Sequence, residues 1–109
     1  MKIENTKAQM RKGILEYCIL EILSKKESYP SDIINELKKA ELIVVEGTLY
    51  PLLTRLKNAG ILNYNWVESQ SGPPRKYYSL TDEGQQFLTE LHNTWTTLQK
   101  AVQKISKPN

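Results

Sequence analysis

The 109-residue sequence contains a single cysteine, Cys18, and a single histidine, His92. One cysteine excludes an intramolecular disulfide and a multi-cysteine zinc site, and it is typical of a reducing compartment. Because Cys18 lies in a strongly apolar segment, we interpret it as a small buried hydrophobe and not as a redox sensor. One cysteine and one histidine are too few to form a metal-ligand set, so we expect no metal site. The low cysteine content also leads us to expect a cytoplasmic protein.

The sequence also lacks long apolar runs and the motifs of catalysis. No run approaches the length that crosses a bilayer, and the polar segment after Met1 has no signal-peptide core, which predicts a soluble, unprocessed chain. There is no paired nucleophile and base, no glycine-rich phosphate loop and no carboxylate pattern for acid and base roles. We therefore expect neither an enzyme nor a bound cofactor. The length corresponds to a single domain with a modest core.

The basic excess is small, but its placement is informative. The formal net charge is +3 and the sequence pI is about 9.0, which favours an anionic partner without identifying it. The cations gather in three separated groups, which are Lys7, Arg11 and Lys12, then Arg55 and Lys57, then Arg75 and Lys76. Three such groups can follow one phosphate backbone, although they also fit ordinary solvated charges.

Two helices are predicted in the first forty residues. Residues 7–25 carry apolar side chains around much of the circumference, a pattern typical of a helix that is buried on two sides. In so short a chain we expect the second side to contact another subunit, through residues that include Ile14 and Cys18. Residues 28–39 form a second, shorter predicted helix with Pro30 near its start.

A third helix with two different faces is predicted before Gly60, which supplies its C-terminal stop. Leucines at 49, 52, 53 and 56 follow the spacing of one inward face. The opposite face then carries Tyr50, Pro51, Thr54, Arg55 and Asn58. Aromatic, hydroxyl, amide and guanidinium groups suit stacking, base-edge hydrogen bonds and phosphate contacts. Thr48 is expected to be the N-cap, because Pro51 then lies in the first turn, where its missing N–H leaves no bond unmade.

An antiparallel hairpin is predicted after the third helix. Residues 61–69 place Leu62, Tyr64 and Trp66 at alternate positions, the period of a strand with one buried face. Residues 77–80 form the second predicted strand. The intervening segment contains a glycine followed by two prolines and is predicted to be the turn.

Thr81 predicts the start of a last helix, because an acidic first turn follows it and the apolar pattern continues to about Ile105. Its inward positions, three or four residues apart, form a heptad-type seam of Leu88, Leu91, Trp95, Leu98, Val102 and Ile105. Such a seam on a protruding helix needs a partner. We expect a second copy of the chain in a two-fold homodimer.

The predicted order of helix, helix, helix, hairpin and helix is that of a winged helix-turn-helix, a mainly α (α+β) fold with a two-stranded β wing. We assign residues 1–80 to a winged helix-turn-helix DNA-binding domain. Residues 81–109 are assigned to a long C-terminal dimerisation helix that belongs to the same compact domain.

Several motifs extend this interpretation: RKGILE at 11–16, GTLYPLL at 47–53, RL at 55–56, Gly60, GPPRKYY at 72–78 and LTDEG at 80–84. Through these motifs the sequence resembles the PadR (phenolic acid decarboxylase regulator) family of bacterial transcriptional regulators. The resemblance is to the short members with a single C-terminal helix, and it covers roughly residues 10–98.

The resemblance implies that the third helix enters the major groove of DNA, while the second helix and the wing contact flanking phosphates. The resemblance and the outward face of the third helix together give the candidates for DNA binding. They are Ser31, Thr48, Tyr50, Pro51, Thr54, Arg55, Gly72, Arg75 and Lys76. Many relatives have Tyr-Gly-Tyr where this chain has Tyr29-Pro30-Ser31, so a tyrosine contact to phosphate is not carried over there. Trp95 matches a tryptophan that lines a flat ligand pocket between the subunits of some relatives.

We therefore expect a homodimeric transcriptional regulator that represses by occupying double-stranded operator DNA and is released by a small hydrophobic or aromatic ligand. Two alternatives stay open, a winged-helix module that binds another protein without DNA and a ligand-sensing dimer that acts through a partner. For single residues, Tyr50 can instead brace the wing, and Trp95 can be a packing residue of the seam. The wing cations can instead protect an edge strand from aggregation.

Overall fold

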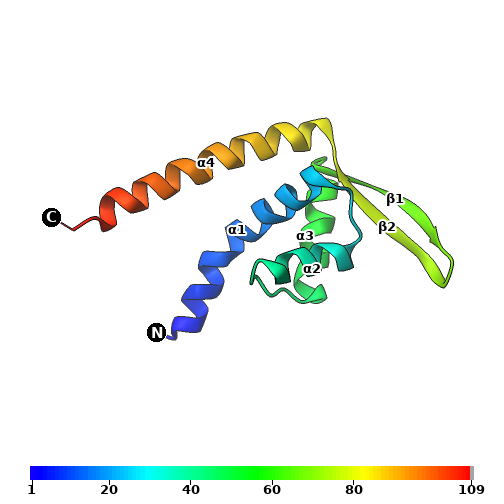
Figure 1. The fold of residues 1–109 in the computed structure, drawn as a ribbon, viewed down its shortest axis with the longest axis horizontal. Helices are drawn as coiled ribbons and strands as arrows, with labels where there is room; N and C mark the ends of the chain where they lie inside the picture. The colour runs from blue at the N-terminus through cyan, green and yellow to red at the C-terminus, as the bar shows by residue number, and fades with distance from the viewer. Residues whose placement is uncertain (109) are drawn as a thin grey trace.

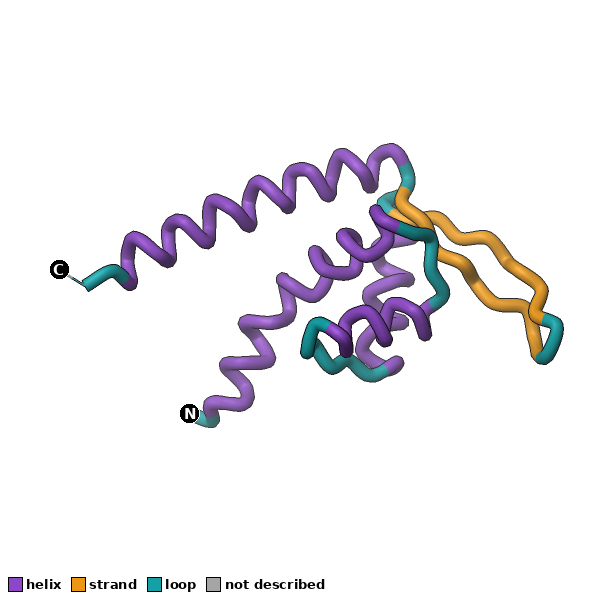
Figure 2. Tube along the Cα trace, in the orientation of Figure 1, coloured by secondary structure: helices purple, strands orange, loops and turns teal. Residues whose placement is uncertain are grey.

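The computed structural model describes residues 1–108 as four helices and one β-hairpin (Figures 1 and 2). The elements are α1 (Ile3–Lys25), α2 (Pro30–Lys39), α3 (Glu46–Asn58), β1 (Leu62–Ser69), β2 (Gly72–Leu80) and α4 (Asp82–Ser106). Figure 1 shows α1 and α4 meeting near the base of the hairpin and diverging toward the two termini, with the hairpin on the opposite side. The predicted fold is confirmed. Within the described residues, no helix is long and apolar enough to cross a membrane.

The hydrophobic core lies where the C-terminal half of α1 meets α2, α3 and the base of the hairpin. Its buried side chains are Ile19, Leu20, Leu23, Ile33, Leu37, Leu49, Leu53, Leu56, Leu62, Tyr78 and Leu88. The N-terminal half of α1 extends beyond this core, and its residues before Ile14 are exposed. The helix also begins earlier than its apolar pattern indicated, at Ile3. Only one end of α1 is therefore covered by its own chain.

The start of α3 differs from the prediction. Its N-cap is Val45, no side chain caps it, and Thr48 lies within the helix, so the expected N-cap at Thr48 is wrong. Pro51 consequently lies inside the helix, where its ring removes the hydrogen bond to the carbonyl of Gly47. Both residues are exposed, and water can reach that carbonyl from the outer side of the helix. A proline is tolerated here because it lies on the solvent side.

The hairpin turn also lies elsewhere than predicted. Gly72, Pro73 and Pro74 belong to β2, and Ser69 pairs with Gly72, so the turn consists of the two residues between them. Proline cannot donate to a sheet, but in a two-stranded hairpin each strand has a free edge that accommodates it. The two prolines thus stiffen the strand that carries the wing cations, rather than the tip.

The exposure of Trp66 corrects a second expectation about the hairpin. Leu62 is buried and Tyr64 half-buried, as the alternation predicted, but Trp66 is 62% exposed. The hairpin extends beyond the core (Figure 1), so the far half of β1 has no core to cover either face. Trp66 is therefore a surface residue of the wing.

Short-range contacts at Thr81 set the direction of α4. The Thr81 hydroxyl accepts a hydrogen bond from the Gly84 N–H at 2.9 Å, as expected for an N-cap, and donates one to the Gly60 carbonyl at 2.6 Å. Gly60 has a φ of 81° and ends α3 in the left-handed conformation that glycine favours. A Cβ on Gly84 would lie 2.1 Å from the carbonyl oxygen of Ile61. Glycine at 84 therefore lets α4 begin directly against the end of α3.

Candidate nucleic-acid interface

Helix α3 presents one apolar face to the core and one polar face to solvent. Leu49, Leu53 and Leu56 are buried. On the other side, Glu46, Tyr50 and Thr54 are spaced four residues apart and exposed, and we call them the α3 row. Tyr50 is 46% exposed, which places it outside the core.

A hollow of about 480 Å³ separates the α3 row from the hairpin, and we call it the α3–wing hollow. Its lining comes from the start of α2, the α3 row and both strands, and consists of Tyr29, Pro30, Ser31, Glu46, Tyr50, Thr54, Trp66, Pro74, Arg75, Lys76 and Tyr78. Five predicted DNA-binding residues meet here: Ser31, Tyr50, Thr54, Arg75 and Lys76. Segments separated by more than forty residues in sequence thus share one polar and aromatic surface.

The cations of the wing lie over aromatic rings. Lys76 Nζ is 4.5 Å from the ring centre of Tyr64 and 5.4 Å from that of Trp66, which is its direct partner across the hairpin. The Arg75 guanidinium lies 5.7 Å from the ring centre of Tyr29. Such stacking limits the freedom of a long cationic side chain without neutralising it. Within residues 1–108, neither Arg75 nor Lys76 forms an ion pair with a carboxylate, so both charges are available to a partner.

The start of α2 is held against the wing by backbone pairing. Ser28 N–H donates to the Tyr78 carbonyl at 3.1 Å, and Tyr78 N–H donates to the Ser28 carbonyl at 2.9 Å. Tyr29 packs on Tyr77 with ring centres 4.7 Å apart, and its N–H donates to Asp32 Oδ2 at 3.2 Å. Burial raises the pKa of the Tyr78 phenol, which therefore stays neutral at the base of the wing. These contacts fix the relative position of Ser31 and the wing cations.

Four predicted DNA-binding residues lie outside the hollow. Arg55 forms an ion pair with Glu16 of α1, because its position on α3 turns it toward that helix. Thr48 lines a different hollow of about 770 Å³ between α1 and the segment before α3. Pro51 lies on the outer face of α3, and Gly72 lies beside the turn at the far end of the hairpin. Sequence spacing alone did not distinguish these four residues from the five that line the α3–wing hollow.

Glu46, Trp66 and Tyr29 are among the residues of the hollow that were missed as site candidates. Glu46 lies four residues before Tyr50, and this helical spacing predicts that the two share a face of α3. The prediction requires the observed start of α3, which lies before the expected N-cap at Thr48. Trp66 was interpreted as a buried strand residue. Tyr29 was set aside because this chain departs from the Tyr-Gly-Tyr of its relatives there, and no local pattern indicates its long-range contact with Arg75.

The predicted seam of α4 changes from buried to exposed along the helix. Leu88 is 4% exposed and belongs to the core of its own chain, which leaves little of it for a partner. Leu91 and Trp95 are half-buried, while Leu98, Val102 and Ile105 are 53%, 60% and 83% exposed. On α1, Ile14 and Cys18 are half-buried, and burial raises the pKa of the Cys18 thiol, with Glu21 adding to the effect. The last three seam residues form an apolar surface that no other part of residues 1–108 covers.

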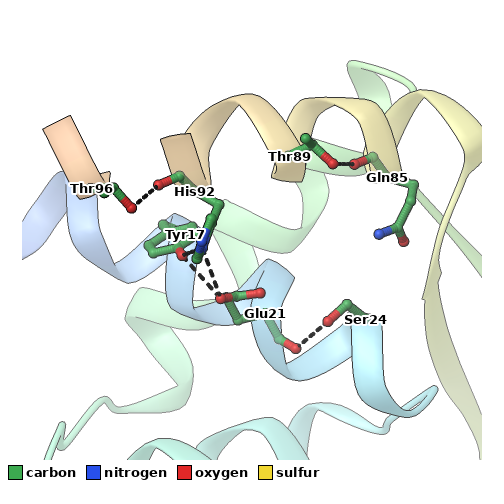
Figure 3. A network of polar contacts seen from close by, with 7 residues as sticks. All are labelled: Tyr17, Glu21, Ser24, Gln85, Thr89, His92 and Thr96. Atoms are coloured by element: carbon green, nitrogen blue, oxygen red, sulfur yellow. Dashed lines mark hydrogen bonds and ion pairs between the residues drawn. The ribbon is translucent and has the colours of Figure 1, made fainter. Parts of the chain in front are cut away.

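A polar cluster joins α1 to α4 near the base of this seam (Figure 3). The Tyr17 hydroxyl donates to Glu21 Oε2 at 3.0 Å and lies 2.8 Å from His92 Nδ1. With its proton directed to Glu21, the hydroxyl oxygen accepts from His92 when Nδ1 carries the hydrogen. Burial, and next the Glu21 carboxylate, raise the pKa of Tyr17 to about 12. Within the described residues, no three histidine, cysteine or acidic side chains are grouped to hold a metal ion.

Three helices, a hairpin wing beside the exposed face of the third helix and a long fourth helix define a winged helix-turn-helix protein of the transcription-regulator class. The pattern of the Transcriptional regulator PadR-like family matches residues 19–90, and the chain belongs to this family.

Solved structures of other family members have the same fold. A PadR-like transcription factor from Bacteroides fragilis is 62% identical, with a TM-score of 0.81 over 94% of this chain and 99% of that one. A PadR-like regulator from Bacillus cereus is 36% identical, with a TM-score of 0.83 over 93% and 99% of the two chains. A family member from Eggerthella lenta is 31% identical, with a TM-score of 0.83 over 98% and 94%. All three are described as transcription factors or transcriptional regulators.

Proposed function

We propose that this protein binds a two-fold DNA operator as a homodimer and represses transcription by occupying that site. The observation that carries the proposal is the α3–wing hollow, where the exposed α3 row meets two wing cations that have no carboxylate partner within residues 1–108. Duplex DNA is a polyanion with hydrogen-bonding base edges, and this surface offers both cations and hydrogen-bonding groups.

The proposed binding mode follows from the position of the hollow. When a recognition helix lies in the major groove, the sugar–phosphate backbone that borders the groove passes beside it. The hollow lies between α3 and the wing, and this position supports the proposal that the backbone binds there. Arg75, Lys76 and Ser31 then contact phosphates, while Tyr50 and Thr54 face the base edges. Arg55 contributes only if its pairing with Glu16 opens.

The apolar end of α4 supports the proposed homodimer. Leu98, Val102 and Ile105 lie along one stripe of a helix that extends away from the core. A second copy with the same stripe covers it and sets the distance between the two α3 helices. In this proposal residues 1–80 bind DNA, while residues 81–109 hold the dimer together. Two linked half-sites bind far more tightly than one, so the dimer determines the affinity.

We further propose that Trp95 contacts a small flat hydrophobic or aromatic effector at the dimer axis. It is half-buried and lies between the covered and uncovered parts of the seam. An effector held there changes the separation of the α3 helices and releases the operator. Saturable quenching of Trp95 fluorescence by planar aromatic compounds, in a Trp66→Phe background, tests this part. If no such compound quenches Trp95, the effector is removed from the proposal.

The DNA-binding proposal is tested by selection from a randomised duplex library followed by salt titration of the selected sequence. We expect a selected site with two-fold symmetry. The logarithm of the binding constant should fall with the logarithm of salt concentration at a slope of about −0.9 per phosphate contact. If no duplex is retained at low salt, the protein is instead a winged-helix module for protein partners or a ligand-sensing dimer.

A further inference from the structure

One carboxylate, that of Glu46, lies among the cations, hydroxyls and aromatic rings of the α3–wing hollow. We propose that Glu46 is a specificity-determining residue that accepts a hydrogen bond from the exocyclic amino group of a cytosine in each operator half-site. This inference rests on the proposed DNA-binding function and adds to it a base preference and the residue that imposes it.

The carboxylate of Glu46 has no polar partner among the residues that the structure describes. Glu46 is exposed, and within residues 1–108 its side chain forms neither an ion pair nor a hydrogen bond. Arg75 and Lys76 line the same hollow but lie over Tyr29, Tyr64 and Trp66 instead. Glu46 is thus free to contact whatever fills the hollow.

A free carboxylate on a surface that binds a polyanion is unfavourable unless the partner offers it a hydrogen. Phosphate oxygens repel it, and so do the N7 and O6 atoms of guanine and the O4 atom of thymine. The amino groups of cytosine and adenine are the hydrogen-bond donors on the major-groove edges. On adenine the amino group has the N7 acceptor beside it, which opposes a second carboxylate oxygen. Cytosine is therefore the base that a glutamate at this position favours.

The position of Glu46 on α3 fits contact with a base edge. It is the first residue of the helix and begins the α3 row, in which Tyr50 and Thr54 follow at intervals of four. In helix-turn-helix proteins the N-terminal residues of the recognition helix are those that reach the bases. Glu46, Tyr50 and Thr54 then lie along successive parts of the groove.

A purely structural role for Glu46 makes a different prediction. The N-cap Val45 offers no side-chain acceptor, and a carboxylate in the first turn stabilises a helix through its dipole. That role requires a negative charge at the helix start but no particular base in the DNA. Glu83 is the second residue of α4 and also lies in a first turn, is exposed and does not line the hollow, so it is the control of the same residue type.

The test compares wild type, Glu46→Gln and Glu83→Gln by selection from a randomised duplex library, with affinities for single-base variants of the selected site. We expect wild type to prefer cytosine at one position of each half-site. In Glu46→Gln the preference at that position should fall about fivefold or more, or move to adenine, because an amide pairs with adenine. Binding to random duplex should strengthen, since a repelling charge is lost. Glu83→Gln should keep the wild-type site.

Glu46→Asp, which keeps the charge but shortens the side chain, should weaken the cytosine preference without strengthening random binding. Thermal denaturation shows whether each variant is folded, and the Asp variant keeps the test decisive if Glu46→Gln is not. Identical base preferences in wild type and both Glu46 variants would overturn the inference and leave Glu46 as a helix-dipole residue. If wild type itself selects no duplex, the proposed DNA-binding function fails instead.

Discussion

The α3–wing hollow and the end of α4 are both exposed surfaces, but their chemistry is opposite. The hollow combines aromatic rings with hydroxyl, carboxyl and cationic groups, and its charged side chains, Glu46, Arg75 and Lys76, are at least partly exposed to water in the isolated chain. The end of α4 instead exposes Leu98, Val102 and Ile105 on one stripe. An exposed polar surface is stable alone, whereas contiguous apolar residues rimmed by polar ones mark an interaction site. In line with the proposed function, we expect a polar and reversible partner for the hollow and an apolar and constitutive partner for the end of α4.

The two surfaces also differ in how they are built. The hollow is assembled from α2, α3 and the hairpin, whose positions are fixed by the shared core. The end of α4 is a single helix beyond that core, and among the described residues the contacts that hold α4 lie at its start and at its junction with α1. Full burial of each seam side chain contributes about 1.5–3 kcal/mol. A partner that covers the end of α4 would therefore stabilise the fold by burying these side chains. The hollow is already fixed by the core, so its stability does not require a partner.

The largest effect is expected from breaking the apolar surface. Leu98→Glu places a charge in the middle of the exposed stripe, where pairing with a second copy would bury it without a partner. We expect monomers at micromolar concentration in sedimentation experiments. DNA affinity should fall about 100-fold, because the two half-sites are no longer linked.

Gln99→Glu is the control for this change, because it adds the same charge at the next position, outside the seam. It should leave both the oligomeric state and DNA binding close to wild type. A Leu98→Glu protein that remains dimeric would show that the end of α4 is not the contact between copies.

A smaller effect is expected from removing the wing cations. Together, Arg75→Ala and Lys76→Ala should weaken binding to all duplex sequences by about tenfold or more, because phosphate contacts carry little base information. The salt slope should decrease by about two. Loss of the exposed Lys100 and Lys104 on α4 is the matched change in charge and should have little effect. A loss confined to one DNA sequence would contradict the phosphate role.

The helices were predictable because their signals are local. The leucine spacing of α3, the stop at Gly60 and the N-cap at Thr81 all depend on neighbours within one or two turns. The prediction that Thr48 is the N-cap was wrong because Pro51 does not require α3 to begin within one turn of it. Pro51 instead lies on the exposed side of α3, and the packing of α3 decides which side is exposed.

The candidate site was only half predictable because its geometry is long-range. The cations of the wing and Tyr50 were identified from their residue types and neighbours. The ion pair of Arg55 with Glu16 joins residues far apart in the sequence, and no local pattern indicates it. Trp66 has the alternation of a buried strand, yet burial depends on whether a core lies beside it, and here the hairpin extends past the core.

Tyr50→Ala tests whether the α3 row contacts DNA. Tyr50 is 46% exposed, so its loss should leave the melting temperature within a few degrees of wild type. Affinity for the selected site should fall several-fold, about 1 kcal/mol, while binding to random duplex changes less. Tyr50→Phe, which keeps the ring, separates stacking from hydrogen bonding. A large drop in melting temperature would instead assign Tyr50 to bracing the wing.

The smallest effect is expected at the junction that connects the two surfaces. Tyr17→Phe removes the hydroxyl that lies between Glu21 and His92 but keeps the ring. We expect an unchanged dimer, nearly unchanged DNA binding and a melting temperature a few degrees lower at pH 8, because a partly exposed hydrogen-bonding group contributes only modestly.

The pH dependence of this difference identifies its cause. Folding raises the pKa of Tyr17 from its usual value near 10 to about 12, so the folded protein favours the neutral phenol. The stability that this contributes is fully present below pH 10 and is lost as the pH rises toward 12. The melting curves of wild type and Tyr17→Phe should therefore converge over that interval. If the Tyr17→Phe difference stays constant to pH 12, the Tyr17 hydroxyl is not held between Glu21 and His92 as drawn in Figure 3.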